Sequence, residues 1–228
     1  MPYPRIIAHR GGGLLAPENT LAGFMLAARL GRRGVEFDVT LSLDRIPVLM
    51  HDETVDRTTD GRGEVAALTL AELREFDAGG EPVPTLAEAL DLCRSLGLWV
   101  NVEIKAGGKR EALTGELVAR LLSARWPGAG VVSSFSETAL AAARAAAPEL
   151  DYALLAETPP ADWPQRLERL GCRALHCAAA SFRPELAASG IPVACYTVND
   201  RRQADALLAA GATAIFTDRP DLWGTDEG

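Results

Sequence analysis

Short β-branched runs alternate with alanine- and leucine-rich segments along the whole chain, which indicates strands separated by helices. Glycines such as Gly97 and Gly171 stand where these helices are expected to end. Helices are predicted at Leu21–Leu30, Leu86–Leu96, Arg110–Arg125, Glu137–Ala147, Asp162–Leu170 and Arg201–Ala210. Strands joined by crossovers are predicted at Arg5–His9, Val35–Val39, Trp99–Ile104, Val131–Phe135, Asp151–Ala156, Ala174–Cys177, Val193–Thr197 and Ala214–Thr217.

This alternation predicts an α/β fold with a parallel sheet. Eight strands are also the number that closes a (β/α)8 barrel of the TIM type. The length of 228 residues lies at the lower end for such a barrel. We therefore expect residues 1–228 to form a single barrel domain, with no linker and no second domain.

The interval between the second and third of these strands is too long for one crossover. It contains a further apolar run, Pro47–His51, that begins only a few residues after the second strand. A parallel return needs about a dozen residues, so this run is expected to fold back as an extra antiparallel hairpin. The hairpin would bring His51 to the height of Glu36 and Asp38. The polar stretch Asp52–Glu64 is then expected to form a loop over the mouth of the barrel.

Composition and charge exclude several classes of protein. Apolar residues make up 48% and charged residues 24%, which is typical of a globular chain. A net charge of −8 and a pI near 5.0 give no basic field for nucleic acid. The longest uncharged stretch, Leu186–Asn199, contains glycine and proline and is shorter than the about 20 apolar residues of a membrane span. A homo-oligomer is compatible with the sequence, but nothing in it indicates one.

The cysteines and the N-terminal segment indicate a cytoplasmic protein. No basic segment with an apolar core precedes the first strand, so we expect no secretory signal. The cysteines show no C-x-x-C pairing, which favours four reduced, mostly buried thiols over a disulfide or a metal site. They are Cys93, Cys172, Cys177 and Cys195.

Ionisable residues occupy strand positions that should be apolar in a parallel sheet covered by helices. Residues i and i+2 of a strand share a face, so Glu36 points with Asp38, and Glu103 points with Lys105. Burying such charges is costly unless they are paired or bind a metal. A salt-bridge network that fills the barrel is one interpretation. A functional site explains more, because the charges fall at the carboxyl ends of strands, where barrel active sites lie.

The charged residues form two chemical sets. Glu36, Asp38 and Glu103 offer three carboxylates, a hard oxygen-donor set that suits one divalent cation, Mg²⁺ or Ca²⁺, better than Zn²⁺. Arg10 and Lys105 supply fixed positive charge that can bind an anionic substrate.

Histidines and aromatic residues complete the candidate site. His9 and His51 each end a strand, and imidazole titrates near neutral pH, so both are candidates for proton transfer. Together with the metal and anion sets, they predict a phosphoryl-transfer site. Phe135 and Tyr196 come late in their strands and are candidates for a pocket wall. His176 lacks a carboxylate two positions away and is expected to be a lining or packing residue.

Short motifs from about residue 5 to residue 222 resemble the glycerophosphodiester phosphodiesterase family in order and spacing. Many members of that family carry Trp where this chain has Tyr196. The segments Met1–Thr20, Tyr196–Asn199 and Thr217–Asp218 are most similar to its cytoplasmic, glycerol-phosphate-scavenging branch. The motifs are His9-Arg10-Gly11, Pro17-Glu18-Asn19-Thr20, Glu36-Phe37-Asp38-Val39, His51-Asp52, Arg57-Thr58-Thr59, Val102-Glu103-Ile104-Lys105, Ser134-Phe135 and Thr197-Val198-Asn199.

The resemblance implies a TIM-type barrel with one divalent cation on Glu36, Asp38 and Glu103. It implies that His9 and His51 are catalytic, and that a small-molecule glycerophosphodiester reacts with water to give sn-glycerol 3-phosphate and an alcohol. The implied route uses the 2-hydroxyl of the substrate as the nucleophile and passes through a cyclic phosphate. The native metal, the preferred alcohol and the order in which the two histidines act stay open.

Three alternatives compete with this interpretation. The pattern Gly11-x-Gly13-x-x-Ala16 fits a loose dinucleotide fingerprint, but Pro17 falls where the phosphate-binding helix should be running. A non-catalytic sensor of a phosphodiester would not need both histidines. A lysophospholipase D-like activity on single-chain lipids would use similar residues, but the acidic surface and the lack of an amphipathic membrane helix favour small water-soluble substrates.

Overall fold

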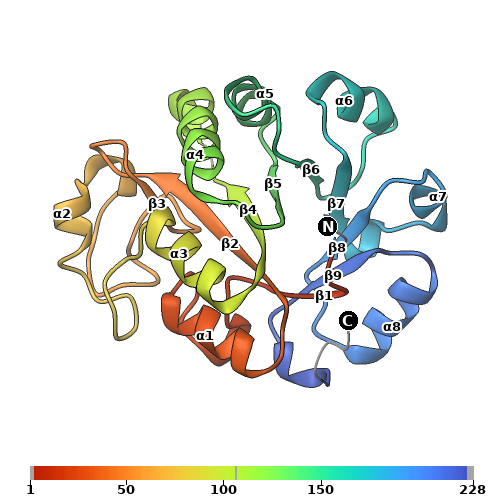
Figure 1. The fold of residues 1–228 in the computed structure, drawn as a ribbon, viewed down its shortest axis with the longest axis horizontal. Helices are drawn as coiled ribbons and strands as arrows, with labels where there is room; N and C mark the ends of the chain where they lie inside the picture. Colours follow the sequence, from red (N-terminus) through yellow and green to blue (C-terminus); the bar gives the residue numbers. More distant parts are fainter. Residues whose placement is uncertain (1–2, 106, 225–228) are drawn as a thin grey trace.

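The computed structural model describes residues 3–105 and 107–224. Its barrel strands are β1 (Ile6–Ala8), β2 (Gly34–Leu41), β4 (Trp99–Ile104), β5 (Gly130–Ser134), β6 (Tyr152–Ala156), β7 (Ala174–Ala178), β8 (Val193–Tyr196) and β9 (Ala214–Thr217). All neighbours in this set are parallel, and the barrel closes because β1 pairs with both β9 and β2 (Figure 1). The predicted (β/α)8 barrel is therefore confirmed.

The extra hairpin is also confirmed. Strand β3 (Pro47–Leu49) pairs antiparallel with the outer end of β2, with Leu49 opposite Val39. Ser42 stabilises the turn between them, because its hydroxyl donates to Asp44 (2.6 Å) and accepts from the backbone N–H of Ile46 (2.9 Å). The hairpin returns the chain alongside β2 (Figure 1), where the backbone N–H of Met50 donates to the carbonyl of Asp38 (3.1 Å), so the next residue, His51, lies near the carboxylates of that strand.

The segment after β3 lies beside the barrel, on the left in Figure 1. It contains a short 3₁₀ turn, Val65–Ala67, and the one-turn helix α2 (Leu70–Leu73), which is too short to produce a helical period in the sequence. Part of the predicted polar loop Asp52–Glu64 packs here, because Val55 is fully buried. The segment has its own apolar cluster, formed by Val48, Met50, Val55, Val65, Leu73, Ala78 and Val83.

Helices surround the barrel (Figure 1). Six of them match the predicted helices to within one residue at each end, while α2 and α7 were not predicted. Thr85 and Glu88 form a capping box at the start of α3, which fixes that end as the sequence suggests. Besides α2, the helices are α1 (Leu21–Arg29), α3 (Leu86–Leu96), α4 (Glu111–Arg125), α5 (Glu137–Ala146), α6 (Trp163–Leu170), α7 (Pro184–Ala187) and α8 (Arg201–Ala209).

The apolar core has two layers. The larger one lies between the strands and the helices, where Phe37 of β2 contacts Phe24 of α1 with ring centroids 5.1 Å apart. The smaller one fills the floor of the barrel, where the ring of Tyr3 packs on Trp99 at 4.8 Å. Strand β9 contributes Phe216 to this floor, and four successive strands each contribute an alanine. They are Ala153, Ala174, Ala194 and Ala214.

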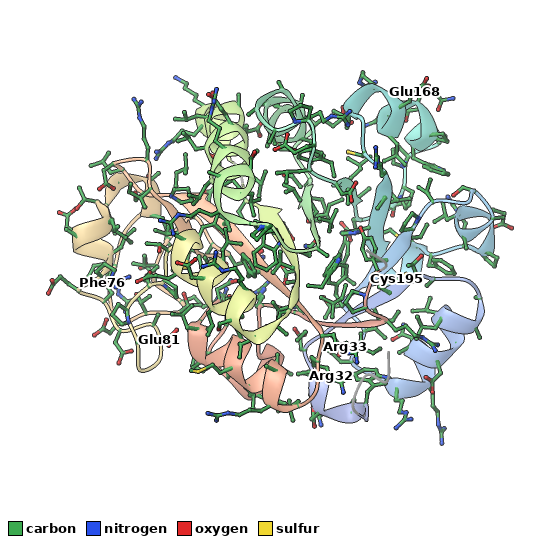
Figure 2. The ribbon with its side chains drawn as sticks, in the orientation of Figure 1. Arg32, Arg33, Phe76, Glu81, Glu168 and Cys195 are labelled. Carbon is green, nitrogen blue, oxygen red and sulfur yellow. The ribbon has the colours of Figure 1, made fainter. Side chains whose placement is uncertain are left out.

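The four cysteines are buried and free. Cys177 and Cys195 are register partners on β7 and β8, and Figure 2 shows Cys195 within the sheet. Charged side chains such as Glu168 on α6 occupy the outside. Among the helices of the described residues, none is both long enough and apolar enough to cross a membrane.

Candidate active site

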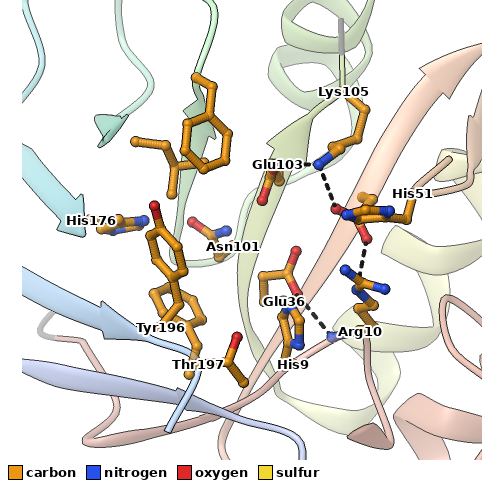
Figure 3. A pocket seen from close by; sticks show the side chains of 14 residues that line it. His9, Arg10, Glu36, His51, Asn101, Glu103, Lys105, His176, Tyr196 and Thr197 are labelled. Carbon is orange, nitrogen blue, oxygen red and sulfur yellow. Dashed lines mark hydrogen bonds and ion pairs between the residues drawn. The ribbon is translucent and has the colours of Figure 1, made fainter. Parts of the chain in front are cut away.

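A cavity of about 190 Å³ lies at the carboxyl ends of the barrel strands. Side chains from β2, β4, β7 and β8 and from the loops after β1, β3 and β5 surround it (Figure 3). The structure brings together in this cavity every residue that the sequence selected. These residues are His9, Arg10, Glu36, Asp38, His51, Glu103, Lys105, Phe135 and Tyr196.

Three carboxylates form the centre of the site. Glu36 and Asp38 lie on β2, and Glu103 is the register partner of Asp38 on β4, so their side chains share the barrel interior. One oxygen of each carboxylate lies within 4.8 Å of the others, a spacing that can hold a metal ion. Burial and the charge of Asp38 raise the pKa of Glu36 to about 8 and that of Glu103 to about 7. Glu36 and Glu103 are therefore fully ionised at neutral pH only when additional positive charge lies close to them.

Two cations adjoin the carboxylates. The backbone N–H of Arg10 donates to Glu36 (2.8 Å), and its Nε lies 3.5 Å from Asp38. Nζ of Lys105 donates to Glu103 (3.0 Å) and lies 3.9 Å from Asp38. Burial lowers the pKa of Lys105, but Glu103 and Asp38 more than offset it, so the net pKa is raised and the ammonium keeps its charge.

Each predicted histidine is held by a carboxylate. Nδ1 of His9 lies 2.6 Å from Asp218, and Nδ1 of His51 lies 2.6 Å from Asp52. Nε2 of His9 lies 3.8 Å from Glu36, toward the carboxylate cluster. Burial lowers the pKa of His9, but Glu36 and Asp218 more than offset it and raise the pKa above the ordinary value. Since Nδ1 is occupied in both rings, Nε2 is the atom that each can offer to a ligand.

A chain of ion pairs connects the two sides of the site. Arg57 donates to Glu18 at 2.7 Å through two nitrogens and to Asp52 at 2.7 and 3.0 Å. Glu18 also accepts from Arg10 at 3.0 Å. The Arg57 guanidinium holds the pKa of Asp52 well below its usual range, so this carboxylate stays ionised beside His51. The loop after β1 and the segment after β3 are thereby fixed relative to each other.

The aromatic residues form the cavity wall. The rings of Phe135 and Tyr196 meet edge to face with centroids 6.0 Å apart, and Nζ of Lys105 lies 6.0 Å from the Phe135 ring centre. Phe135 is half exposed and follows β5 rather than ending it, so it stands at the outer edge of the cavity.

Sequence reasoning missed several residues at this site. Asn101 precedes Glu103 by two positions on β4, so the same alternation could have found it. Asn19 comes directly before Thr20, which caps the N-terminus of α1. In the structure Thr20 accepts from the backbone N–H of Gly23 in α1, and Asn19 donates to Asp38 (2.9 Å) instead. The other residues of the cavity that the sequence did not select are Leu155, Thr197 and Phe216.

The fold and the site define a TIM-barrel enzyme whose cavity combines acidic, basic and imidazole groups. The chain belongs to the glycerophosphoryl diester phosphodiesterase family, whose family model matches residues 9–222. The protein is therefore a phosphodiesterase, and the resemblance found in the sequence is confirmed.

Individual relatives agree with this assignment. A glycerophosphodiester phosphodiesterase of Caldanaerobacter subterraneus subsp. tengcongensis is 34% identical over 230 residues, which cover 95% of this chain and 94% of the relative. Human glycerophosphodiester phosphodiesterase 1 is 46% identical over 116 residues, which cover 46% of this chain and 35% of the human protein. An Oleispira antarctica phosphodiesterase, solved in complex with the product sn-glycerol-3-phosphate, superposes with a TM-score of 0.92 at 38% identity and covers 96% of this chain and 94% of its own.

Proposed function

We propose that this protein hydrolyses glycerophosphodiesters to sn-glycerol 3-phosphate and an alcohol, using one divalent cation and two histidines. The observation that carries the proposal is the gathering of three carboxylates, two cations and two carboxylate-bound histidines around one cavity. The product bound to the Oleispira antarctica phosphodiesterase supports the same substrate class.

Glu36, Asp38 and Glu103 are the residues that would hold the cation. Oε1 of Glu36 and Oδ1 of Asp38 are buried without a hydrogen-bond partner among the described residues, so two of the three groups have a free ligand atom. Oxygen donors of this kind suit Mg²⁺ or Ca²⁺. When bound, such a cation supplies positive charge that polarises the phosphoryl group and acidifies a nearby hydroxyl.

Arg10 and Lys105 position the phosphate and stabilise the negative charge that develops on its oxygens. Arginine can fork to two phosphoryl oxygens, while lysine acts as a point charge. Both groups are held in place before substrate binds, Arg10 by Glu18 and Lys105 by Glu103. Preorganised charges of this kind supply a large part of the rate gain in phosphoryl transfer.

The histidines move the protons. Nε2 of His9 takes the proton of the substrate's 2-hydroxyl, whose oxygen attacks phosphorus while the bond to the alcohol oxygen breaks. Nε2 of His51 gives a proton to the departing alkoxide. Water then opens the cyclic phosphate, and each histidine reverses its role, so both return to their starting protonation states. Asp218 and Asp52 orient the rings throughout.

The proposal treats residues 1–228 as one phosphodiesterase domain that acts in the cytoplasm on small-molecule diesters, and not on nucleic acid. The family match spans most of that length. The buried free thiols and the net charge of −8 favour this location and this substrate class.

The test is the release of glycerol 3-phosphate from a panel of glycerophosphodiesters, with Mg²⁺, Ca²⁺, Mn²⁺ or a chelator. We expect release with at least one cation and none in chelator. Absence of release from every diester with every cation would overturn the proposed function. Equal release in chelator would overturn the role given to the cation.

A further inference from the structure

Three buried polar atoms on one wall of the cavity have no hydrogen-bond partner within residues 3–105 and 107–224. They are Oδ1 of Asn101, Nδ1 of His176 and the hydroxyl of Tyr196. Figure 3 shows these side chains together, across the cavity from Lys105, His51 and Arg10. Asn101 is 1% exposed and His176 is fully buried, so a missing partner at either one costs free energy. A polar ligand that enters the cavity can therefore find partners on this wall.

Neighbouring residues fix what Asn101 and His176 can offer. Nδ2 of Asn101 donates to the hydroxyl of Ser133 (3.0 Å), which leaves Oδ1 as an acceptor. Nε2 of His176 lies 3.1 Å from the hydroxyl of Tyr3. Burial lowers the pKa of His176 to about 3, so the ring is neutral and carries one proton. When Tyr3 donates to Nε2, that proton sits on Nδ1 and faces the cavity as a donor.

The wall is thus neutral and offers a donor at His176, an acceptor at Asn101 and a group at Tyr196 that can do both. An alcohol hydroxyl donates one hydrogen bond, can accept two and carries no charge, so it matches this set of three groups. A carboxylate, a phosphate or an ammonium group does not match, because these three residues provide no opposite charge. The phosphate has its own partners across the cavity, Arg10 and Lys105.

The depth of the wall decides which end of a diester it receives. The leaving alcohol differs between glycerophosphodiesters, so it needs the open side of the cavity, away from the buried Asn101 and His176. The glycerol moiety is common to all of them and can occupy the closed side. We propose that Asn101, His176 and Tyr196 bind the terminal hydroxyl of the glycerol, an inference that rests on the proposed function. The enzyme then requires a substrate whose glycerol is not acylated.

An acyl group on that hydroxyl would meet two obstacles. The ester oxygen has no proton, so Oδ1 of Asn101 would stay unpaired, and a site built to bind a hydroxyl discriminates strongly against its absence. The acyl chain would also have to fit beside the other groups in a cavity of about 190 Å³. The wall therefore selects small diesters over single-chain lysophospholipids.

The experiment compares kcat/KM of the full-length enzyme on three substrates in the presence of its activating cation. They are glycerophosphocholine, its analogue without the terminal hydroxyl (2-hydroxypropyl phosphocholine), and 1-acyl-lysophosphatidylcholine. The analogue keeps the 2-hydroxyl, so the reacting groups are unchanged. We expect kcat/KM to be roughly 10²-fold lower for the analogue, and lower still for the lysolipid.

Two variants test whether Tyr196 is responsible for the difference in kcat/KM between the substrates. Tyr196→Phe should lower kcat/KM on glycerophosphocholine about tenfold and change it less than about twofold on the analogue, because the analogue lacks the group that Tyr196 binds. Tyr152→Phe is the matched control, because the Tyr152 hydroxyl is buried against Ala143 and Ala147, outside the cavity. It should change neither value.

Two outcomes would overturn the inference while leaving the proposed function intact. One is equal kcat/KM for glycerophosphocholine and the analogue in the wild-type enzyme, which would mean that the wall binds only water. The other is a lysolipid turned over as fast as glycerophosphocholine. A wild-type enzyme that releases glycerol 3-phosphate from no diester overturns the proposed function, and this inference with it.

Discussion

Asp218 accepts a hydrogen bond from Nδ1 of His9 over 2.6 Å, although 209 positions separate them in the chain. Asn199 fixes this carboxylate from two directions: its Nδ2 donates to Asp218 (2.9 Å), and its Oδ1 accepts from the Asp218 backbone (2.7 Å). The same kind of hydrogen bond joins Nδ1 of His51 to the carboxylate of Asp52 over 2.6 Å, here between adjacent residues of the chain. Both imidazoles are thus oriented by ionised carboxylates, which also stabilise a protonated ring.

Replacing Asp218 with Asn should lower kcat roughly 10- to 10³-fold with little change in KM, because the amide no longer fixes the ring of His9. The pKa of His9 also loses one of the influences that raise it. Activity that needs unprotonated His9 rises as pH passes this pKa, so the acid limb of the pH–rate profile should move to lower pH. Steady-state kinetics over a range of pH measure both the loss of kcat and the shift of the acid limb. Asp221→Asn, at an exposed ion pair with Arg219, is the control, and a wild-type profile for Asp218→Asn would contradict the assignment.

Replacing His9 or His51 with Ala should lower kcat roughly 10²–10⁴-fold, the usual contribution of a positioned acid or base. Cation binding should survive in both variants, because neither residue belongs to the carboxylate cluster. Steady-state kinetics and calorimetric titration with Mg²⁺ or Ca²⁺ together check this. A loss smaller than tenfold would remove that histidine from proton transfer.

The sequence predicted the barrel and the centre of the site because both leave local signals. Charges at i and i+2 in otherwise apolar strands marked Glu36, Asp38, Glu103 and Lys105. Their convergence depends on β2 pairing with β4, and this followed once Pro47–His51 was recognised as a hairpin outside the barrel.

The groups that hold the site in place could not be predicted, because they depend on tertiary packing. Asn19 has the sequence position of a helix cap, yet only the folded structure brings it to Asp38. Asp218 reaches His9 because Gly13 lets the loop after β1 approach the Asp218 backbone, where a Cβ would collide. Tyr3 meets His176 only inside the closed barrel floor. No spacing in the sequence encodes these contacts.

Replacing Asp38 with Asn or Glu103 with Gln should abolish cation-dependent turnover and weaken cation binding, while the side-chain shape is kept. Each change removes one of only three carboxylate ligands from the cluster. Calorimetric titration and turnover in Mg²⁺ or Ca²⁺ measure the effect. Glu116→Gln, which affects only an exposed ion pair with Arg120, should behave as the wild type. Full turnover by Asp38→Asn in chelator would exclude the cluster as a functional metal site.

The same cluster makes stability depend on pH when no cation is bound. The pKa values of Glu36 and Glu103, about 8 and about 7, lie above the ordinary value of 4.5, so the folded state binds these protons more tightly than the unfolded chain. Unfolding then releases protons between about pH 4.5 and 8, and stability falls as pH rises through this window. The raised pKa of His9 acts in the same direction, since its contribution is lost as pH rises through the folded value. The lowered pKa of His176 acts in the opposite direction up to about pH 6.5, but this single imidazole offsets only part of the effect of the two carboxyl groups. The pKa values of Asp52 and Asp218 are lowered, so their contributions change only in more acidic solution.

In chelator, the Tm should therefore fall as the pH is raised from about 5 to about 8. Saturating Mg²⁺ or Ca²⁺ should remove most of this fall, because a cation binds the ionised carboxylates of the folded state and stabilises it more as they lose protons. Differential scanning calorimetry at several pH values, with and without cation, measures both slopes. Glu36→Gln should flatten the slope in chelator, since its amide does not titrate. A Tm that rises with pH in chelator would mean that Glu36 and Glu103 stay ionised without a cation, and the main reason for placing a cation beside them would be lost.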